Sequence, residues 1–248
     1  MINPTMNINR LSTGTSIVSI PYDNGVITAT DLRATDTRTF QYYNAQEKTS
    51  KSCMDEIYVS GAGASTGTDW CAYPVIAHLD KCLKYYYVSL NQIESPVDFL
   101  NLFNKFAIDY FKKIGYRVPG FAEIVFQCEF LINVNTKKLN FAFKTNMAGD
   151  SAMEASTNAH VGNVESKDIL AIGSGGRYLV GALCQENSLK PLNTRPLAQC
   201  IELLKTAFVN TCGKDLASSV AEGLQITVFQ NGGKTYDHRI SGVVTNSK

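Results

Sequence analysis

The feature that most constrains this chain is a pair of short apolar segments joined by a tight turn, close to the N-terminus. Residues 17–20 and 26–29 are mainly β-branched or small apolar residues. Asp23, Asn24 and Gly25 lie between them, and Asn and Gly readily adopt the positive φ angles of a tight turn. The sequence therefore predicts a β-hairpin here.

Two charged residues close the second segment of this hairpin. Asp31 and Arg33 stand at alternate positions, so we expect their side chains on the same face of the strand. Taken alone, the pattern is typical of a hairpin at the edge of a sheet with a surface ion pair. The residues before the hairpin favour another interpretation, because Gly14 is followed directly by the hydroxyl residues Thr15 and Ser16.

This arrangement resembles the mature start of proteasome β-type subunits and of their bacterial relative, the HslV peptidase. In that family, cleavage after a glycine leaves a threonine as the new N-terminus, and Gly14 and Thr15 occupy those places. Residues 31–35 match the Asp-x-Arg-x-Thr-like pattern that ends this part of the family's sequence, and the spacing from Thr15 to Asp31 needs no gap. The resemblance implies that residues 1–14 are a propeptide, whereas such a polar segment is more commonly a disordered tail. Residues 15–248 are expected to form one domain.

Bulk properties exclude several classes of function. The net charge is +1 and there is no basic run, which argues against nucleic acid or an anionic membrane as a partner. No apolar run is long enough to span a membrane, and residues 1–14 lack the apolar stretch of a secretory signal. The seven cysteines form no CxxC pair, which is typical of free thiols in a reducing compartment, so a cytoplasmic protein is expected. The three histidines are dispersed, and we expect neither a metal nor a cofactor.

Apolar periodicity along the rest of the chain predicts two pairs of helices and several strands. The predicted helices cover residues 69–87, 96–114, 178–185 and 198–212, and the predicted strands cover residues 56–60, 122–134, 139–144, 168–172 and 224–229. Two antiparallel sheets between helical layers accommodate this order. The resemblance implies the same α+β architecture, a four-layer αββα sandwich.

Three further places carry candidate site residues. Gly63 lies in a small-residue turn where a backbone N–H can approach an oxyanion, although such a turn is also an ordinary tight connection. Ser174 lies in a Gly-Ser-Gly turn that lacks the spacing and the lysine of a phosphate loop. Asp215 and Ser218 are typical of capping at a helix end. The resemblance implies an oxyanion-binding role for Gly63, and places Ser174, Asp215 and Ser218 beside the N-terminal amine.

The resemblance also implies a mechanism. Thr15 Oγ would be the nucleophile, and the freed α-amino group, with an ordinary pKa of about 7.7–8.0, would be the base. A lysine held by Asp31 would lower the pKa of that amine by like-charge repulsion. Lys51 is preferred for this place because residues 53–57 can follow it as strand, whereas Lys48 keeps a distance from Asp31 closer to that of the family.

The expected function is that of a threonine endopeptidase subunit, self-processed between Gly14 and Thr15. It would act on unfolded polypeptides inside a ring of copies or related subunits, supplied by an ATPase unfoldase or a ring cap. While the Gly14–Thr15 bond is intact, the Thr15 nitrogen is an amide and cannot act as the base. The alternatives are a non-catalytic ring subunit with the same fold and an amidohydrolase of the wider N-terminal-nucleophile (Ntn) superfamily that acts on a small amide.

Overall fold

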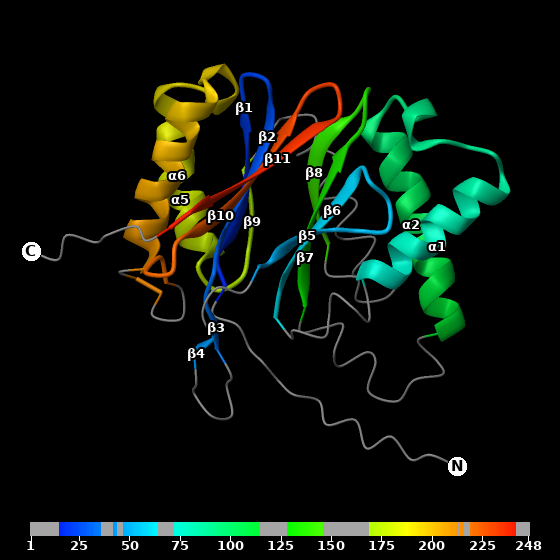
Figure 1. Ribbon diagram of the computed structural model, residues 1–248, viewed down its shortest axis with the longest axis horizontal. Helices are drawn as coiled ribbons and strands as arrows, with labels where there is room; N and C mark the ends of the chain where they lie inside the picture. The colour runs from blue at the N-terminus through cyan, green and yellow to red at the C-terminus, as the bar shows by residue number, and fades with distance from the viewer. Residues whose placement is uncertain are drawn as a thin grey trace, which may run out of the picture.

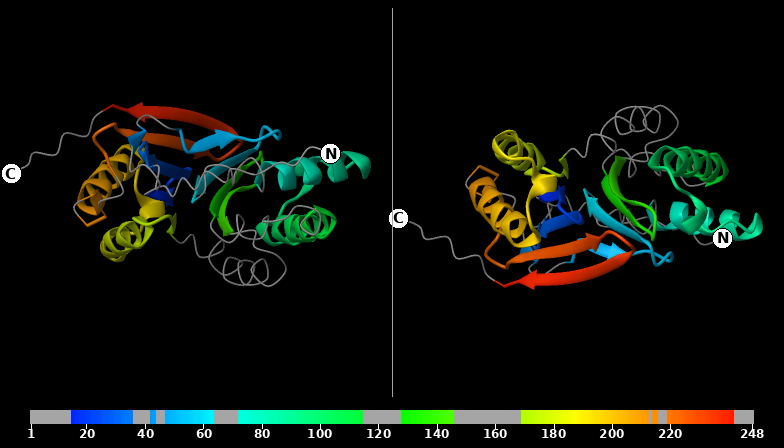
Figure 2. Two further views of the ribbon diagram at one scale, coloured as in Figure 1. Left: turned by 90° about the horizontal axis from the view of Figure 1, so that it is seen from below. Right: turned by 90° about the horizontal axis from the view of Figure 1, so that it is seen from above.

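The computed structural model has four layers, with two sheets stacked between two pairs of helices (Figure 1). It describes residues 15–35, 42–43, 47–63, 72–114, 128–145, 169–212, 214–215 and 219–241. Figure 2 shows the same order of layers from above and from below, with α5 and α6 on one side of the sheets and α1 and α2 on the other. The αββα sandwich predicted from the sequence is confirmed.

The first sheet has five antiparallel strands in the order β11-β10-β2-β1-β9. Its strands are β1 (Ile17–Tyr22), β2 (Gly25–Asp31), β9 (Leu170–Ile172), β10 (Leu224–Gln230) and β11 (Lys234–Ile240). The predicted hairpin is formed by β1 and β2, in a register that pairs Ile17 with Thr30. Because β9 and β10 flank it on either side, this hairpin lies inside the sheet, and its interpretation as an edge hairpin is wrong.

The second sheet has four antiparallel strands in the order β5-β6-β7-β8. Its strands are β5 (Thr49–Lys51), β6 (Ile57–Ala62), β7 (Glu129–Asn135) and β8 (Asn140–Thr145). Two further strands, β3 (Ala34–Thr35) and β4 (Tyr42–Tyr43), pair with each other and with no other strand of the described residues. The predicted strand over 122–134 is found as β7, and residues 122–127 lie outside the described residues.

Within the described residues, four α-helices cover the outer faces of the sheets. They are α1 (Tyr73–Tyr85), α2 (Pro96–Ile114), α5 (Gly176–Leu189) and α6 (Leu197–Cys212), with 3-10 turns η2 (Leu90–Gln92) and η3 (Leu192–Thr194) between them. The predicted cap of α2 is confirmed, because the backbone N–H of Val97 donates to Ser95 Oγ at 3.2 Å. Within the described residues, no helix combines the length and the apolar character needed to cross a membrane.

Each sheet buries its outward face against helices and its inward face against the other sheet. Alternate apolar residues of β1, β2 and β10 pack on α5 and α6, and those of β6, β7 and β8 pack on α1 and α2. The inter-sheet layer is more polar: a small apolar cluster includes Ile17 and Ala62, and nearby Thr28 Oγ1 donates to Asn133 Oδ1 at 3.0 Å. The side chains between the sheets therefore include polar groups that can form hydrogen bonds, as well as apolar groups that pack.

The turn from β9 to α5 lies directly against the start of β1. Gly173 in this turn has φ +82°, and a Cβ added there would stand 2.1 Å from the carbonyl oxygen of Thr15. A Cβ at Gly175 would stand 1.8 Å from Ser16 Oγ. Only glycine fits at position 173, because both the left-handed φ and a backbone contact this close exclude a side chain. At position 175 the backbone has an ordinary φ of −80°, so an added side chain is opposed by the clash with Ser16 alone.

We expect the substitution Gly173→Ala to destabilise the fold. The clash with Thr15 and the strained φ should together lower the free energy of unfolding by more than about 2 kcal/mol. Gly181→Ala is the matched control: it lies within α5, where an added Cβ meets nothing within 4 Å. There alanine should raise the stability by up to about 1 kcal/mol. Urea unfolding followed by circular dichroism measures both, and equal midpoints for the two variants would contradict the close contact.

Candidate active site

A buried ion pair lies at the end of β2. Asp31 Oδ1 accepts a hydrogen bond from the Lys48 ammonium at 2.8 Å and another from the backbone N–H of Ser16, also at 2.8 Å. The side chains of Lys48 and Asp31 are only 6% and 0% exposed. Asp31 thus joins the start of β1, where Thr15 precedes Ser16, to the segment that leads into β5.

Burial changes the proton affinity of both partners. It lowers the pKa of Lys48, because the ammonium has lost its water, although the charge of Asp31 opposes this effect. Burial also raises the pKa of Asp31, again against the opposing effect of Lys48. Removal of either partner would leave an uncompensated charge in the interior, which is more costly than the loss of an exposed pair.

The choice of Lys51 as the partner of Asp31 is corrected by the structure. Lys51 lies at the end of β5 with its side chain 48% exposed, and it pairs with Asp55 at 2.9 Å. A turn over 53–56 separates β5 from β6, so the continuous strand that favoured Lys51 does not exist. The signal that pointed to Lys48 was its distance along the chain from Asp31.

Thr15, the predicted nucleophile, is completely buried at the start of β1. Its carbonyl oxygen accepts a hydrogen bond from the N–H of Gly175 at 3.4 Å. Its Oγ1 has no hydrogen-bond partner within the described part of the chain. Buried hydroxyl groups are usually hydrogen-bonded, and within the described residues those of Thr30 and Thr227 are unsatisfied in the same way as that of Thr15.

The structure brings two further predicted site residues together. Ser174 Oγ donates to Asp215 Oδ2 at 2.7 Å. A Cβ added at Gly175 would lie 3.1 Å from Asp215 Oδ2 and also contact Ser16, so the Ser174–Asp215 pair adjoins the start of β1. Ser218 lies outside the described residues.

Gly63, the predicted oxyanion-binding residue, directly follows β6. It has φ +109°, a backbone conformation that side chains disfavour. The preceding residue, Ala62, shares the inter-sheet cluster with Ile17, two residues after Thr15. The end of β6 therefore packs against the same end of β1 that carries Thr15.

Two contacts close to the candidate site were missed from the sequence. Glu129 Oε2, on β7, accepts the backbone N–H of Gly173 at 2.9 Å. Lys144 on β8 pairs with Glu129 Oε1 at 3.0 Å. This pair supports the turn that carries Ser174 from the opposite sheet. No motif marks it in the sequence, because it depends on how the two sheets stack.

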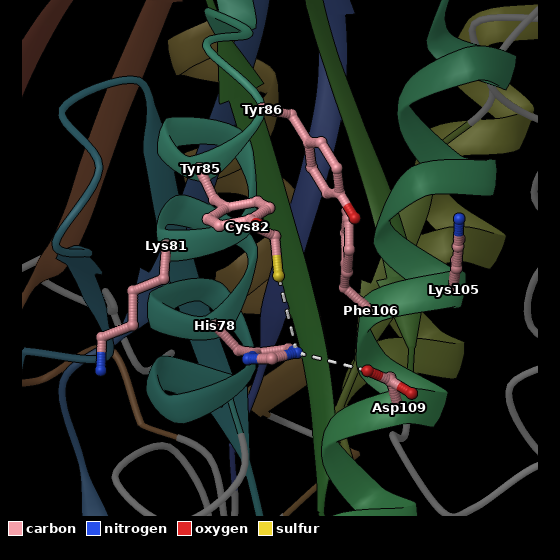
Figure 3. Close-up of a pocket in the computed structure, with 8 residues that line it drawn as sticks. All are labelled: His78, Lys81, Cys82, Tyr85, Tyr86, Lys105, Phe106 and Asp109. Atoms are coloured by element: carbon pink, nitrogen blue, oxygen red, sulfur yellow. Dashed lines mark hydrogen bonds and ion pairs between the residues drawn. The ribbon is translucent and has the colours of Figure 1, made fainter.

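A separate pocket of about 470 Å³ lies between α1 and α2 (Figure 3). His78 Nε2 lies 3.7 Å from Cys82 Sγ and 3.8 Å from Asp109 Oδ2. Both contacts are to the same nitrogen, so His78 is not placed between a thiol and a carboxylate as the base of a nucleophile–base–acid triad would be. Across the described ranges, no three His, Cys, Asp or Glu side chains come together in a way that could hold a metal ion.

Comparisons with known proteins support the fold. No protein-family model and no curated protein matches the chain. Among solved structures, the chain is similar to a Gly-1 mutant of Anbu from Hyphomicrobium sp. strain MC1, with a TM-score of 0.61. The match covers 92% of this chain and 88% of that one, at 14% sequence identity. Anbu is a proteasome-like Ntn-hydrolase subunit of the β type. The chain therefore has the Ntn-hydrolase fold that Anbu has.

Proposed function

We propose that this chain is a self-processing threonine peptidase subunit of a proteasome-like ring. The observation that carries the proposal is the buried ion pair between Lys48 and Asp31 beside the start of β1. An inactive subunit with a purely structural role would gain little from such a pair, because its desolvation offsets most of its Coulomb energy. The pair also identifies Lys48 as the lysine held by Asp31, a choice that the sequence alone left open between Lys48 and Lys51.

Processing would be the first reaction of Thr15. Its Oγ attacks the carbonyl carbon of Gly14, the C–N bond between the two residues breaks, and the hydroxyl proton passes to the leaving nitrogen. The acyl group is then an ester on Oγ, and water hydrolyses it to release residues 1–14. The product carries a free α-amino group on Thr15, which is the base that the intact chain lacks.

Peptide hydrolysis would use the same hydroxyl with the new amine. The amine accepts the Oγ proton during attack and returns it to the leaving nitrogen of the substrate. The Lys48 ammonium lowers the pKa of this amine by like-charge repulsion, and Asp31 holds Lys48 in place. The N–H of Gly63 stabilises the oxyanion, while the side chains of Ser174, Asp215 and Ser218 orient the amine.

The proposed assembly is a ring of copies or related subunits that receives unfolded polypeptides from an ATPase unfoldase or a ring cap. The likeness of the fold to a proteasome-like subunit supports it. Three tyrosines at the end of α1, Tyr85, Tyr86 and Tyr87, are 77%, 65% and 93% exposed. Contiguous exposed aromatic surface of this kind is typical of a protein contact.

Intact mass spectrometry of the purified wild type beside Thr15→Ala tests the nucleophile. We expect the wild type to lose residues 1–14, and the variant to keep the full-length mass of 27.2 kDa, because only Thr15 provides the attacking oxygen. If both proteins stay full length in an assembled ring, the catalytic proposal fails and a structural subunit replaces it.

Lys48→Met beside Lys51→Met tests the lysine. We expect Lys48→Met to slow self-processing by at least about 100-fold, since the cation that favours loss of the proton from the Thr15 hydroxyl during attack is removed. Lys51→Met changes only an exposed pair with Asp55 and should process at the wild-type rate. The fraction of processed chain over time gives both rates, with circular dichroism as a check of folding. Equal rates for the two variants would exclude the role given to Lys48.

A further inference from the structure

One side chain of the first sheet holds the backbone at Lys48. Gln225 lies on β10, next to Leu224, which pairs with Asp31 in the sheet. Its Oε1 accepts hydrogen bonds from the backbone N–H groups of Lys48 and Thr49, each at 3.1 Å. Its Nε2 donates to the carbonyl oxygen of Thr49 at 2.8 Å. A single buried amide thus makes three bonds to two consecutive residues.

These bonds matter because β5 is a short strand at the edge of its sheet. β5 has three residues, and among the strands that the structure describes its single neighbour is β6. Lys48 lies just before it, and its carbonyl oxygen accepts the N–H of Gly61 on β6 at 3.3 Å. The N–H of Lys48 points the other way, towards the first sheet, where Gln225 provides its acceptor. The amide of Gln225 therefore provides hydrogen-bond partners for backbone groups of Lys48 and Thr49 from the opposite sheet.

We propose that Gln225 is a positioning residue for Lys48. Asp31 holds the ammonium, and Gln225 holds the backbone from which the side chain extends. A lysine stem is flexible, so the ammonium reaches a defined place only when both ends are fixed. Lys51, at the far end of β5, makes an ion pair with Asp55 at the surface. The catalytic consequence of this positioning rests on the proposed function, but the placement itself does not.

The chain offers a matched control at the opposite end of β10. Asn140, on β8, also bridges the two sheets, and its Nδ2 donates to the carbonyl oxygen of Phe229 at 2.7 Å and to Asn231 Oδ1 at 3.1 Å. None of these contacts involves a predicted site residue. Asn140→Leu and Gln225→Met each remove one bridging amide, so a purely structural role would give the two variants similar effects on the site.

Amine acylation followed by peptide mass spectrometry tests the placement without any activity. In the wild type and in Asn140→Leu, we expect Lys48 to react at least about tenfold more slowly than the exposed Lys51, because the ion pair protects it. In Gln225→Met, the rate at Lys48 should rise severalfold towards that of Lys51. Gln225→Glu keeps the accepting oxygen and should give a smaller rise. If Lys48 stays as protected in Gln225→Met as in the wild type, the inference is overturned.

Steady-state peptide hydrolysis by the processed chains separates this inference from the proposed function. We expect Gln225→Met to lose about tenfold to 100-fold in kcat with little change in KM, because a displaced ammonium affects chemistry rather than substrate binding. Asn140→Leu should keep the wild-type kcat. A wild type that neither processes nor hydrolyses contradicts the proposed function, and the acylation rates still decide the role of Gln225. A more reactive Lys48 with unchanged kcat would support the placement and remove Lys48 from the chemistry.

Discussion

The interaction on which the candidate site depends is the buried ion pair between Lys48 and Asp31. It joins the two sheets, because Asp31 ends β2 of the first and Lys48 precedes β5 of the second. Taking both charges out of water is costly, and further hydrogen bonds must compensate. The N–H of Ser16 supplies one at the carboxylate, and Gln225 fixes the backbone of the lysine. The first residues of β1 and the segment before β5 are thereby held to one another.

The outer layers of the sandwich differ from the layer between the sheets in what their side chains contribute. The outer faces of the sheets bury large apolar side chains against helices, which provides most of the hydrophobic stabilisation. The layer between the sheets has a smaller apolar cluster and many hydroxyl and amide groups. Polar side chains that cross this layer, including those of Glu129 and Gln225, connect the turn at Gly173 and the edge strand β5 to the opposite sheet. The rigid outer layers thus support a polar interior that can position reacting groups.

The helices, strands and turns could be predicted from the sequence because each depends on residues that are close together in the chain. The turn at Asn24-Gly25, the cap at Ser95 and the apolar stripe of α6 each act within a few residues, and all three are found. The distinction between Lys48 and Lys51 was not local, since it depends on where β5 ends and what faces it. For the same reason the sequence could not place the hairpin inside its sheet or reveal the contacts of Glu129.

The central claim is tested most directly by identifying which residue of the mature chain forms a covalent adduct with a reactive peptide. A peptide epoxyketone can react with both a hydroxyl and an amine of one residue, so it reports a threonine that carries both groups. After proteolysis and tandem mass spectrometry, we expect one adduct, on Thr15, joined through its Oγ and its α-nitrogen. An adduct on another nucleophile such as Cys82, or a mature chain that stays unmodified, would contradict the account of Thr15 as an N-terminal nucleophile.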